Sequence, residues 1–203
     1  MTDGLKRAFD VGTVLGVLLL FLPLLVTLIV VLLVLQGRPV IYRHARIGRG
    51  GAVFHCFKFR TMALNGDEVL RNHLATNPAA QAEWDSSRKL RDDPRITPIG
   101  RALRKSSADE LPQLLNVLRG EMSLVGPRPI VKDEMRYYGG AIHHYQRVKP
   151  GLTGAWQVSG RSDTTYDERV QLDSRYVQTR SFLGDLGILF KTVPAVLKSR
   201  GSY

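Results

Sequence analysis

The longest apolar run in the sequence lies near the N-terminus. Residues 11–35 include no charged side chain, and these 25 positions are enough for one helix to cross a hydrocarbon layer about 30 Å thick. This run is longer than the apolar region of a signal peptide, and the residues that follow it do not form a cleavage site of small residues. The pattern therefore predicts a retained membrane segment. It divides the chain into a membrane part, residues 1–36, and a remainder, residues 37–203.

Pro23 lies at the midpoint of this segment. Proline removes a backbone hydrogen bond and clashes with the preceding turn, so we expect a kink or break there. Thr27, one turn later, is placed to bond the backbone near the break. Lys6 and Arg7 precede the segment and Arg38 follows it, and basic flanks favour the cytoplasmic side. A helix–break–helix hairpin that enters and leaves by one face satisfies both constraints. A kinked spanning helix is the alternative.

The rest of the sequence predicts short, mostly helical elements. A Gly- and Arg-rich turn region occupies residues 37–51, and the alternating pattern of residues 52–59 indicates a strand. Four leucines share one face of a predicted helix over 106–119, which Gly120 ends. A short strand or loop is expected around Trp156. Further helices are predicted over residues 67–90, with an interruption at Asn77-Pro78, and over residues 130–145, 166–180 and 183–198. The fold class is therefore α/β, mostly α, as one small domain held on a membrane.

Composition adds a strong positive charge. Lys and Arg outnumber Asp and Glu by 29 to 18, which gives a formal charge of +11. Such an excess indicates an anionic partner, which is a nucleic acid, an acidic membrane face or a phosphorylated substrate. Because the apolar run places the chain at a lipid bilayer, no nucleic acid is expected. Cys56 is the only cysteine, so no internal disulfide forms, and its apolar neighbours predict a small core residue.

Two adjacent carboxylates, Asp109 and Glu110, lie near the start of the helix predicted over 106–119. One interpretation is structural: Ser107 and Glu110 match the Ser-x-x-Glu capping box, or Asp109 itself caps the helix. The other is chemical, because the first turn of a helix attracts phosphate. A carboxylate there is able to attack phosphorus, or to bind Mg²⁺ together with substrate phosphates. The residues alone leave both interpretations open.

Basic side chains recur beside Gly and Pro turns. Together they are suited to neutralising a diphosphate, since guanidinium groups bind phosphate oxygens in pairs. The sequence has no Walker-type phosphate loop, because the glycines at 48–51 are not followed by Lys-Ser or Lys-Thr. The basic set comprises Arg43, Arg46, Lys58, Arg60, Arg101, Arg104 and Arg128.

Six ordered motifs resemble the bacterial sugar transferases, also called monotopic phosphoglycosyl transferases. They extend over nearly the whole chain, and their order makes the resemblance far more specific than any one motif. They are KRAFD at 6–10, KFRTM at 58–62, DPRIT at 93–97, DELPQLLNV at 109–117, MSLVGPRP at 122–129 and KPGLTG at 149–154.

The resemblance implies a monotopic membrane enzyme with an N-terminal re-entrant helix kinked at a proline, here Pro23. Small interfacial amphipathic helices then hold the catalytic part at the cytoplasmic face of the bacterial inner membrane. Some members have Ser before that proline, where this chain has Leu22. By the family pattern, Asp109 attacks the sugar-bearing phosphorus of a UDP-sugar, releases UMP and passes the sugar phosphate to undecaprenyl phosphate. Asp109 and Glu110 form the Mg²⁺ site, and Glu110 also assists deprotonation of the lipid phosphate.

The resemblance also implies a set of substrate-binding residues. Family positions that contact phosphates or nucleotide correspond to Arg46, Lys58, Arg104 and Arg128. The predicted set is completed by Arg60, Pro129, Tyr176 and Asp185.

Donor and pathway follow from the resemblance to the exopolysaccharide branch, which rests on residues 42–44, the Trp84 region, 104–107 and 156–162. It favours UDP-galactose as donor, with UDP-glucose as the alternative, in the first membrane step of exopolysaccharide or lipopolysaccharide synthesis. The competing interpretation is a non-catalytic membrane-bound assembly protein of polysaccharide synthesis. Whether the chain forms a homodimer is left open.

Overall fold

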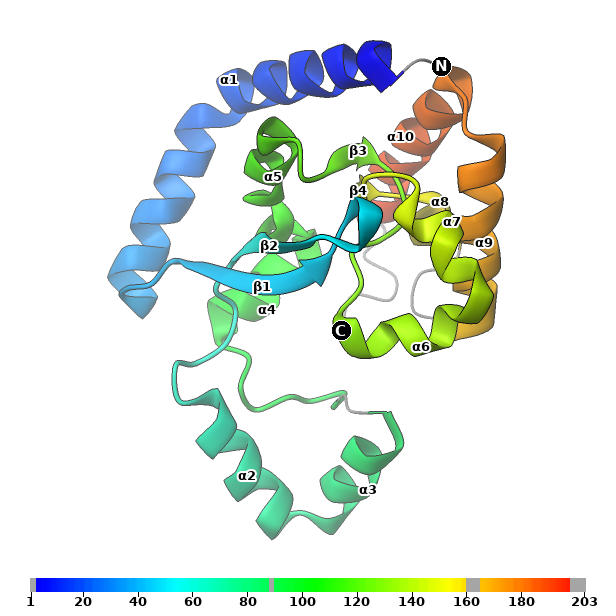
Figure 1. The fold of residues 1–203 in the computed structure, drawn as a ribbon. Coiled ribbons are helices and arrows are strands. Elements are labelled where there is room, and N and C mark those ends of the chain that lie inside the picture. Colours follow the sequence, from blue (N-terminus) through cyan, green and yellow to red (C-terminus); the bar gives the residue numbers. More distant parts are fainter. Residues whose placement is uncertain (1–2, 88–89, 160–164, 198–203) are drawn as a thin grey trace.

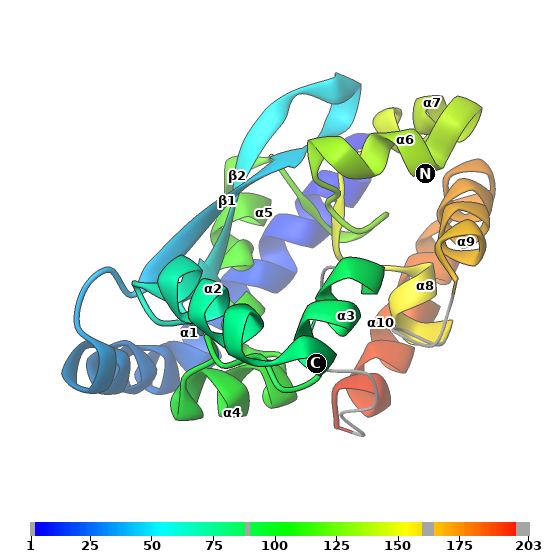
Figure 2. The same ribbon diagram turned by 90° about the horizontal axis from the view of Figure 1, so that it is seen from below.

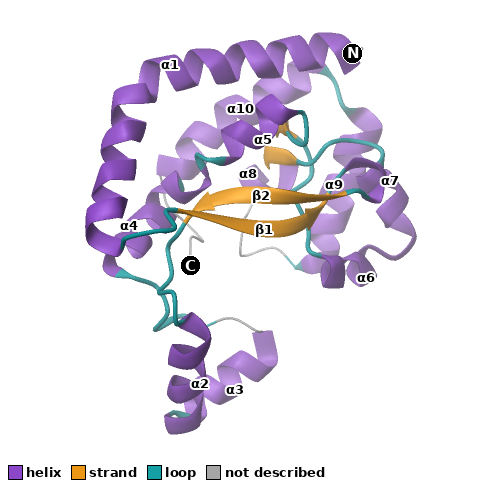
Figure 3. Cartoon of the chain, turned by 60° about the vertical axis from the view of Figure 1, so that its left-hand side comes forward, coloured by secondary structure: helices purple, strands orange, loops and turns teal. Residues whose placement is uncertain are grey.

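The protein is seen in a computed structural model that describes residues 3–87, 90–159 and 165–197. These residues form a mostly helical fold with two small two-stranded sheets. Figure 1 shows a long N-terminal helix, α1 (Asp3–Gln36), arching over a β-hairpin and α5 (Gln113–Arg119). The short helices of residues 132–146 and the helix of residues 166–179 lie at the end of the hairpin that is remote from the C-terminal end of α1 (Figures 1 and 3).

Helix α1 bends about halfway along its length (Figures 1 and 3). The helix is continuous through Pro23, so a bend within one helix replaces the break that we predicted. The Thr27 hydroxyl donates a hydrogen bond to the carbonyl of Pro23 at 2.9 Å, as expected of a group that supports the backbone near a proline. The apolar middle is exposed, with Leu19 and Leu20 at 78% and 73%, and the helix is long and apolar enough to cross a membrane.

Both ends of α1 are bound to the rest of the protein. Near the N-terminal end, the Asp10 carboxylate accepts a 2.7 Å hydrogen bond from the Ser123 hydroxyl. Near the C-terminal end, Leu32 packs in a buried cluster with Phe59 and Leu103. Only the middle part of α1 therefore projects away from the rest of the protein.

The β-hairpin forms one wall of the core. Strand β1 (Ile41–Ile47) pairs antiparallel with β2 (Val53–Phe59). The predicted strand is confirmed as β2, but our turn assignment for 37–51 misses β1. Because β1 is rich in polar residues and only its last residue, Ile47, is buried, its pairing with β2 defines it more than its own pattern does. Cys56 lies in the main buried cluster with Val117 and Met122, which confirms it as a core residue.

Helices α2 (Gly66–Thr76) and α3 (Pro78–Ser87) project from the rest of the protein (Figures 1 and 2). The predicted interruption at Asn77-Pro78 is confirmed, and the pair has its own small cluster of Leu70, Ala80 and Leu90.

The helix predicted over 106–119 is confirmed only in its second half, as α5, and is wrong over residues 106–112. Helix α4 (Pro98–Ser106) ends there, a 3₁₀ turn η2 (Ala108–Glu110) follows, and α5 begins at Gln113. The break occurs at Ser107, whose φ of 57° is left-handed and ends α4. Neither Ser107 nor Pro112, the residues before the two later helices, makes a side-chain capping bond. The structure thus excludes the capping interpretation of Asp109 and Glu110.

The helix predicted over 130–145 is divided into short pieces, because Gly139 adopts a positive φ of 47° in its middle. The segments are η3 (Lys132–Glu134), α6 (Met135–Tyr138), η4 (Gly139–Ala141) and α7 (Ile142–Gln146). Strand β3 (Ser123–Val125) precedes these short helices and β4 (Gly151–Thr153) follows them. The two strands pair in parallel.

The last part of the chain is helical. Trp156 lies in α8 (Ala155–Ser159), where we expected a strand or loop. Helices α9 (Tyr166–Thr179) and α10 (Phe182–Leu197) confirm the final two predicted helices. The predictions also used Lys198 and residues 160–162. These residues lie outside the described part of the chain.

Candidate active site

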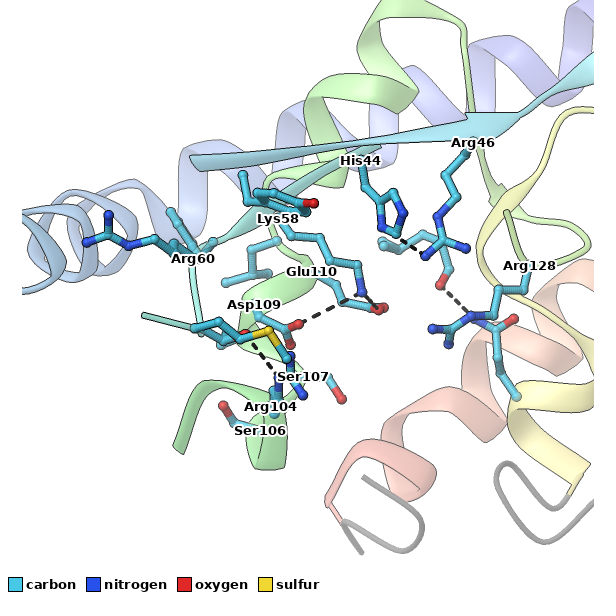
Figure 4. A pocket seen from close by; sticks show the side chains of 18 of the residues that line it. His44, Arg46, Lys58, Arg60, Arg104, Ser106, Ser107, Asp109, Glu110 and Arg128 are labelled. Carbon is cyan, nitrogen blue, oxygen red and sulfur yellow. Dashed lines mark hydrogen bonds and ion pairs between the residues drawn. The ribbon is translucent and has the colours of Figure 1, made fainter. Parts of the chain in front are cut away.

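Asp109 and Glu110 reach a common cavity from the 3₁₀ turn between α4 and α5. The left-handed conformation of Ser107 reverses the chain after α4, and Figure 4 shows both carboxylates directed at the amine of Lys58. Strained backbone of this kind recurs at functional sites. Asp109 is only 8% exposed, so its carboxylate is held largely away from water.

Lys58 connects the two carboxylates from strand β2. Its Nζ atom lies 2.6 Å from Glu110 Oε1 and 3.9 Å from Asp109 Oδ2. The amine is therefore hydrogen-bonded to Glu110, while Asp109 keeps a more distant ion pair.

The pKa values of the two carboxyl groups are shifted in opposite directions. Burial raises the pKa of Asp109 above its ordinary value, although the charge of Lys58 opposes the shift. Burial acts in the same direction on Glu110, but the positive charges of Lys58 and Arg128 outweigh it and lower the pKa of Glu110. Asp109 is thus a desolvated, more basic carboxylate, and Glu110 is a strongly held anion.

Arginines lie at both ends of this carboxylate pair. Arg104 acts on Asp109, and its Nε donates to the Thr61 hydroxyl at 3.0 Å. Arg46 and Arg128 act on Glu110. Burial lowers the pKa of Arg46, and the like charge of Arg128 lowers it further. Both arginines are half-buried, and although Arg46 has Glu134 at 3.6 Å, two neighbouring cations of this kind favour an anionic ligand.

The cavity has a volume of about 1060 Å³, which is at the upper end of the range for ligand pockets. It brings together most of the predicted site residues from β1, β2, α4, η2 and the loop after β3. These are Arg46, Lys58, Arg60, Arg104, Asp109, Glu110 and Arg128.

Arg60 lines the cavity but is used by the chain itself. Its guanidinium donates hydrogen bonds to the carbonyls of Gln36, Gly37 and Arg38, where α1 ends. Cations at this position satisfy free carbonyls of a helix C-terminus. A substrate contact for Arg60 stays a prediction, and Pro129 similarly accepts a 3.0 Å hydrogen bond from Arg46 at the cavity margin.

Tyr176 and Asp185 do not line the cavity. The Tyr176 hydroxyl donates to Asp185 at 2.8 Å, and Asp185 forms a 2.5 Å ion pair with Lys6 of α1. All three are removed from the carboxylate pair, and they bind α1 to α9 and α10. The geometry gives them a structural task, and the substrate contact predicted for Tyr176 and Asp185 stays a prediction. Pro23 lies on the exposed middle of α1.

Three residues that shape or line the cavity were not among the predicted site residues. Gly100 lets α4 approach the backbone of Thr61 so closely that a Cβ atom would lie 2.1 Å from the Thr61 carbonyl oxygen. This approach sets the position of Arg104 one turn later. Trp156 and Arg169 line the far wall from α8 and α9, and nothing in their sequence spacing indicates that they meet.

A metal ion would find only part of its ligands in the protein. Among the described residues, no three His, Cys, Asp or Glu side chains are grouped closely enough to hold one. Mg²⁺ commonly takes one or two carboxylates and completes its shell with substrate phosphates and water. Asp109 and Glu110 match that donor set, and at present the Lys58 amine occupies Glu110.

Comparison with known proteins finds relatives that match nearly the whole chain. The chain is 54% identical over 198 residues to the exopolysaccharide production protein ExoY of Rhizobium meliloti, covering 98% of this chain and 88% of that protein. It is 51% identical over 199 residues to an undecaprenyl-phosphate galactose phosphotransferase of Salmonella typhimurium, covering 98% of this chain and 42% of that longer protein.

A third relative extends the range of donors. The chain is 39% identical over 206 residues to a UDP-glucose:undecaprenyl-phosphate glucose-1-phosphate transferase of Caulobacter vibrioides, covering 98% and 72% of the two chains. The family model described as bacterial sugar transferase matches residues 1–199. With nearly every residue matched, the chain belongs to the bacterial sugar transferase family.

Proposed function

We propose that this protein transfers a hexose 1-phosphate from a UDP-sugar to undecaprenyl phosphate and releases UMP. The observation that carries the proposal is a buried carboxylate, Asp109, beside Glu110 and Lys58 in a cavity whose other charged walls are largely basic. Relatives named for sugar-phosphate transfer to undecaprenyl phosphate support the same reaction.

Asp109 acts as the nucleophile. A carboxylate oxygen attacks the sugar-bearing phosphorus, an aspartyl phosphosugar forms, and UMP leaves with the electron pair of the broken P–O bond. An oxygen of undecaprenyl phosphate then attacks the same phosphorus, and the Asp109 carboxylate is released. Desolvation supports this role, because it raises the basicity of Asp109 and removes the water that would compete for the intermediate.

Charge placement supports an in-line path. Attacking and leaving oxygens lie on opposite sides of the transferred phosphorus, so the UMP phosphate departs on the side away from Asp109. Arg46 and Arg128 lie on the Glu110 side, where they neutralise that phosphate. The lipid phosphate must attack from the same side in the second half-reaction. One basic subsite therefore serves both phosphates in turn, which gives ping-pong kinetics.

Asp109 and Glu110 would hold Mg²⁺ together with the donor diphosphate. When bound, the metal supplies positive charge that stabilises the phosphoryl transition state. Because the lowered pKa of Glu110 makes it a weak base, we assign it to metal binding in preference to deprotonation of the lipid phosphate.

UDP-galactose is the preferred donor, and UDP-glucose is the alternative. The relative named for galactose is 51% identical to the chain, and the one named for glucose is 39% identical. A donor panel scored by UMP release separates the two.

We place the enzyme, as part of this proposal, at the cytoplasmic face of the bacterial inner membrane. The apolar middle of α1 is exposed while both its ends contact the same basic domain. Such an arrangement suits a helix that enters and leaves the bilayer by one face, and a long-chain lipid phosphate reaches a site only at that surface. The product would start exopolysaccharide or lipopolysaccharide synthesis.

The decisive experiment is to trap the intermediate. Purified protein with Mg²⁺ and labelled UDP-galactose or UDP-glucose should give a covalent adduct on Asp109 and about one equivalent of UMP before lipid is added. Asp109→Asn should give neither, while Asp92→Asn, at an exposed loop carboxylate, should behave as wild type. Asp109→Asn that still releases UMP would exclude Asp109 as nucleophile, and a wild-type protein inert to all UDP-sugars would favour the non-catalytic assembly protein.

A further inference from the structure

Two arginines contact the indole ring of Trp156 in the wall of the cavity. The Cζ atom of Arg169 lies 4.3 Å from the centroid of the indole ring, and that of Arg128 lies 5.6 Å from it. The indole is only 5% exposed, so the ring is a fixed support for both guanidinium groups. Cation–π contacts of this kind restrict the orientation of arginine.

Arg169 has unused hydrogen-bonding capacity. Its Nε atom is buried and has no hydrogen-bond partner, and no carboxylate of the described residues forms an ion pair with its guanidinium. Because that atom is closed to solvent, a ligand in the cavity would reach Arg169, which lines it, through the rest of the planar guanidinium group.

The order of charges shows which part of a donor would reach Arg169. Arg104 lies on the Asp109 side and Arg128 on the Glu110 side. In an in-line reaction the leaving nucleotide extends away from Asp109. Its phosphate meets Arg128, and Trp156 and Arg169 lie next to Arg128 along the same wall.

We infer that Trp156 and Arg169 form the uracil-binding end of the donor site; this inference rests on the proposed function. The flat ring of uracil suits a guanidinium plane, on which bases stack in single-stranded RNA recognition. The indole behind Arg169 holds that plane in place, so less conformational freedom is lost on binding.

Calorimetric titration separates base recognition from phosphate recognition. UMP and ribose 5-phosphate are titrated into the full-length protein in nanodiscs with Mg²⁺, because the two ligands share a phosphate and a ribose and differ in the base. Arg169→Ala should weaken UMP binding at least about tenfold and leave ribose 5-phosphate unchanged. Arg169→Lys keeps the charge but loses the planar group, and it should lose most of the same preference.

Steady-state kinetics adds a second readout. In Arg169→Ala the KM for the UDP-sugar should rise at least about tenfold, with kcat at saturating donor and the KM for undecaprenyl phosphate unchanged. Arg175→Ala, at an exposed arginine of the same helix, should match wild type throughout.

Equal UMP affinity in wild type and both Arg169 variants would overturn the inference and leave the proposed function standing. So would an Arg169 variant that weakens UMP and ribose 5-phosphate equally, since this assigns the residue to the phosphate. A rise only in the KM for undecaprenyl phosphate would place the lipid carrier there instead. If wild-type protein neither binds UMP nor releases it from any donor, the proposed function fails first and the inference fails with it.

Discussion

Asp109 and Glu110 are chemically similar neighbours that the fold separates in function. Asp109 is buried with only a distant counter-charge, at 3.9 Å from Lys58 Nζ, whereas Glu110 contacts that amine at 2.6 Å. The result is a raised pKa for Asp109 and a lowered pKa for Glu110. Pairs of carboxylates whose environments separate their pKa values are typical of divided catalytic roles.

These opposite shifts predict opposite effects on stability. A raised folded-state pKa means that ionised Asp109 destabilises the fold at neutral pH, so Asp109→Asn should raise the free energy of unfolding by about 1 kcal/mol. Ionised Glu110 stabilises the fold, so Glu110→Gln should lower it by about 1 kcal/mol. Thermal unfolding of the ligand-free protein at neutral pH checks both signs.

The pH dependence provides the control for this pair. The gain from Asp109→Asn should fade as pH falls through the raised pKa of Asp109, because the wild-type group is then neutral too. The loss from Glu110→Gln should persist until pH falls through the lowered pKa of Glu110. Two variants that shift stability in the same direction at neutral pH would contradict the assigned electrostatics.

At the scale of elements, a buried polar network binds the N-terminal end of α1. Lys6 pairs with Asp185 at 2.5 Å, with side chains 13% and 2% exposed, and Tyr176 donates to the same carboxylate. The side chain of Arg7 adds hydrogen bonds to the carbonyls of Val117 and Leu118 in α5. Helix α1 is thus attached to α5, α9 and α10 at once.

Breaking this network should be costly. Asp185→Asn leaves the buried Lys6 charge with only the more distant carboxylate of Asp10, at 4.0 Å, and we expect a loss of about 3 kcal/mol in the free energy of unfolding. Adding Lys6→Met should recover part of that loss. Asp3→Asn, at an exposed pair with Arg49 whose side chains are 52% and 53% exposed, should cost about 1 kcal/mol or less. Similar melting temperatures for the Asp185 and Asp3 variants would contradict the role given to Asp185.

Sequence patterns predicted the elements whose pattern is strong and local. Helix α1, strand β2 and the last two helices have long apolar runs or clear periodicity. Strand β1 escaped, because its register with β2 and not its own residues makes it a strand. The continuous helix over 106–119 failed at Ser107, since a left-handed serine is not a signal that periodicity contains.

The candidate site was predictable in part. Its charged residues stand in motifs that resemble a family, and the fold collects most of them in one cavity. The contacts that give those charges their properties join distant segments, such as Lys58 with Glu110 and Trp156 with Arg169. Periodicity within one element cannot reveal such pairs, so the unequal pKa directions and the second arginine on Trp156 emerge only from tertiary structure.

At the scale of the whole molecule, the position of α1 fixes how the enzyme meets the bilayer. One domain holds both ends of a bent helix whose exposed middle is apolar. We expect Asp3 and Arg38, which are exposed near the two ends, to face the cytoplasm together. In a Cys56→Ala background, Asp3→Cys and Arg38→Cys should both resist a membrane-impermeant maleimide in intact cells and react after permeabilisation.

Asp92→Cys, on an exposed loop of the domain, gives the reference for the cytoplasmic side. Labelling of Asp3→Cys in intact cells would indicate a spanning helix. In that topology the start of α1 and the domain would lie on opposite faces, and the contacts of Lys6 with Asp185 and of Asp10 with Ser123 could not form. Loss of those buried polar contacts would leave charged groups unpaired at a cost of several kcal/mol, so the same-side topology is the one that the packing of α1 favours.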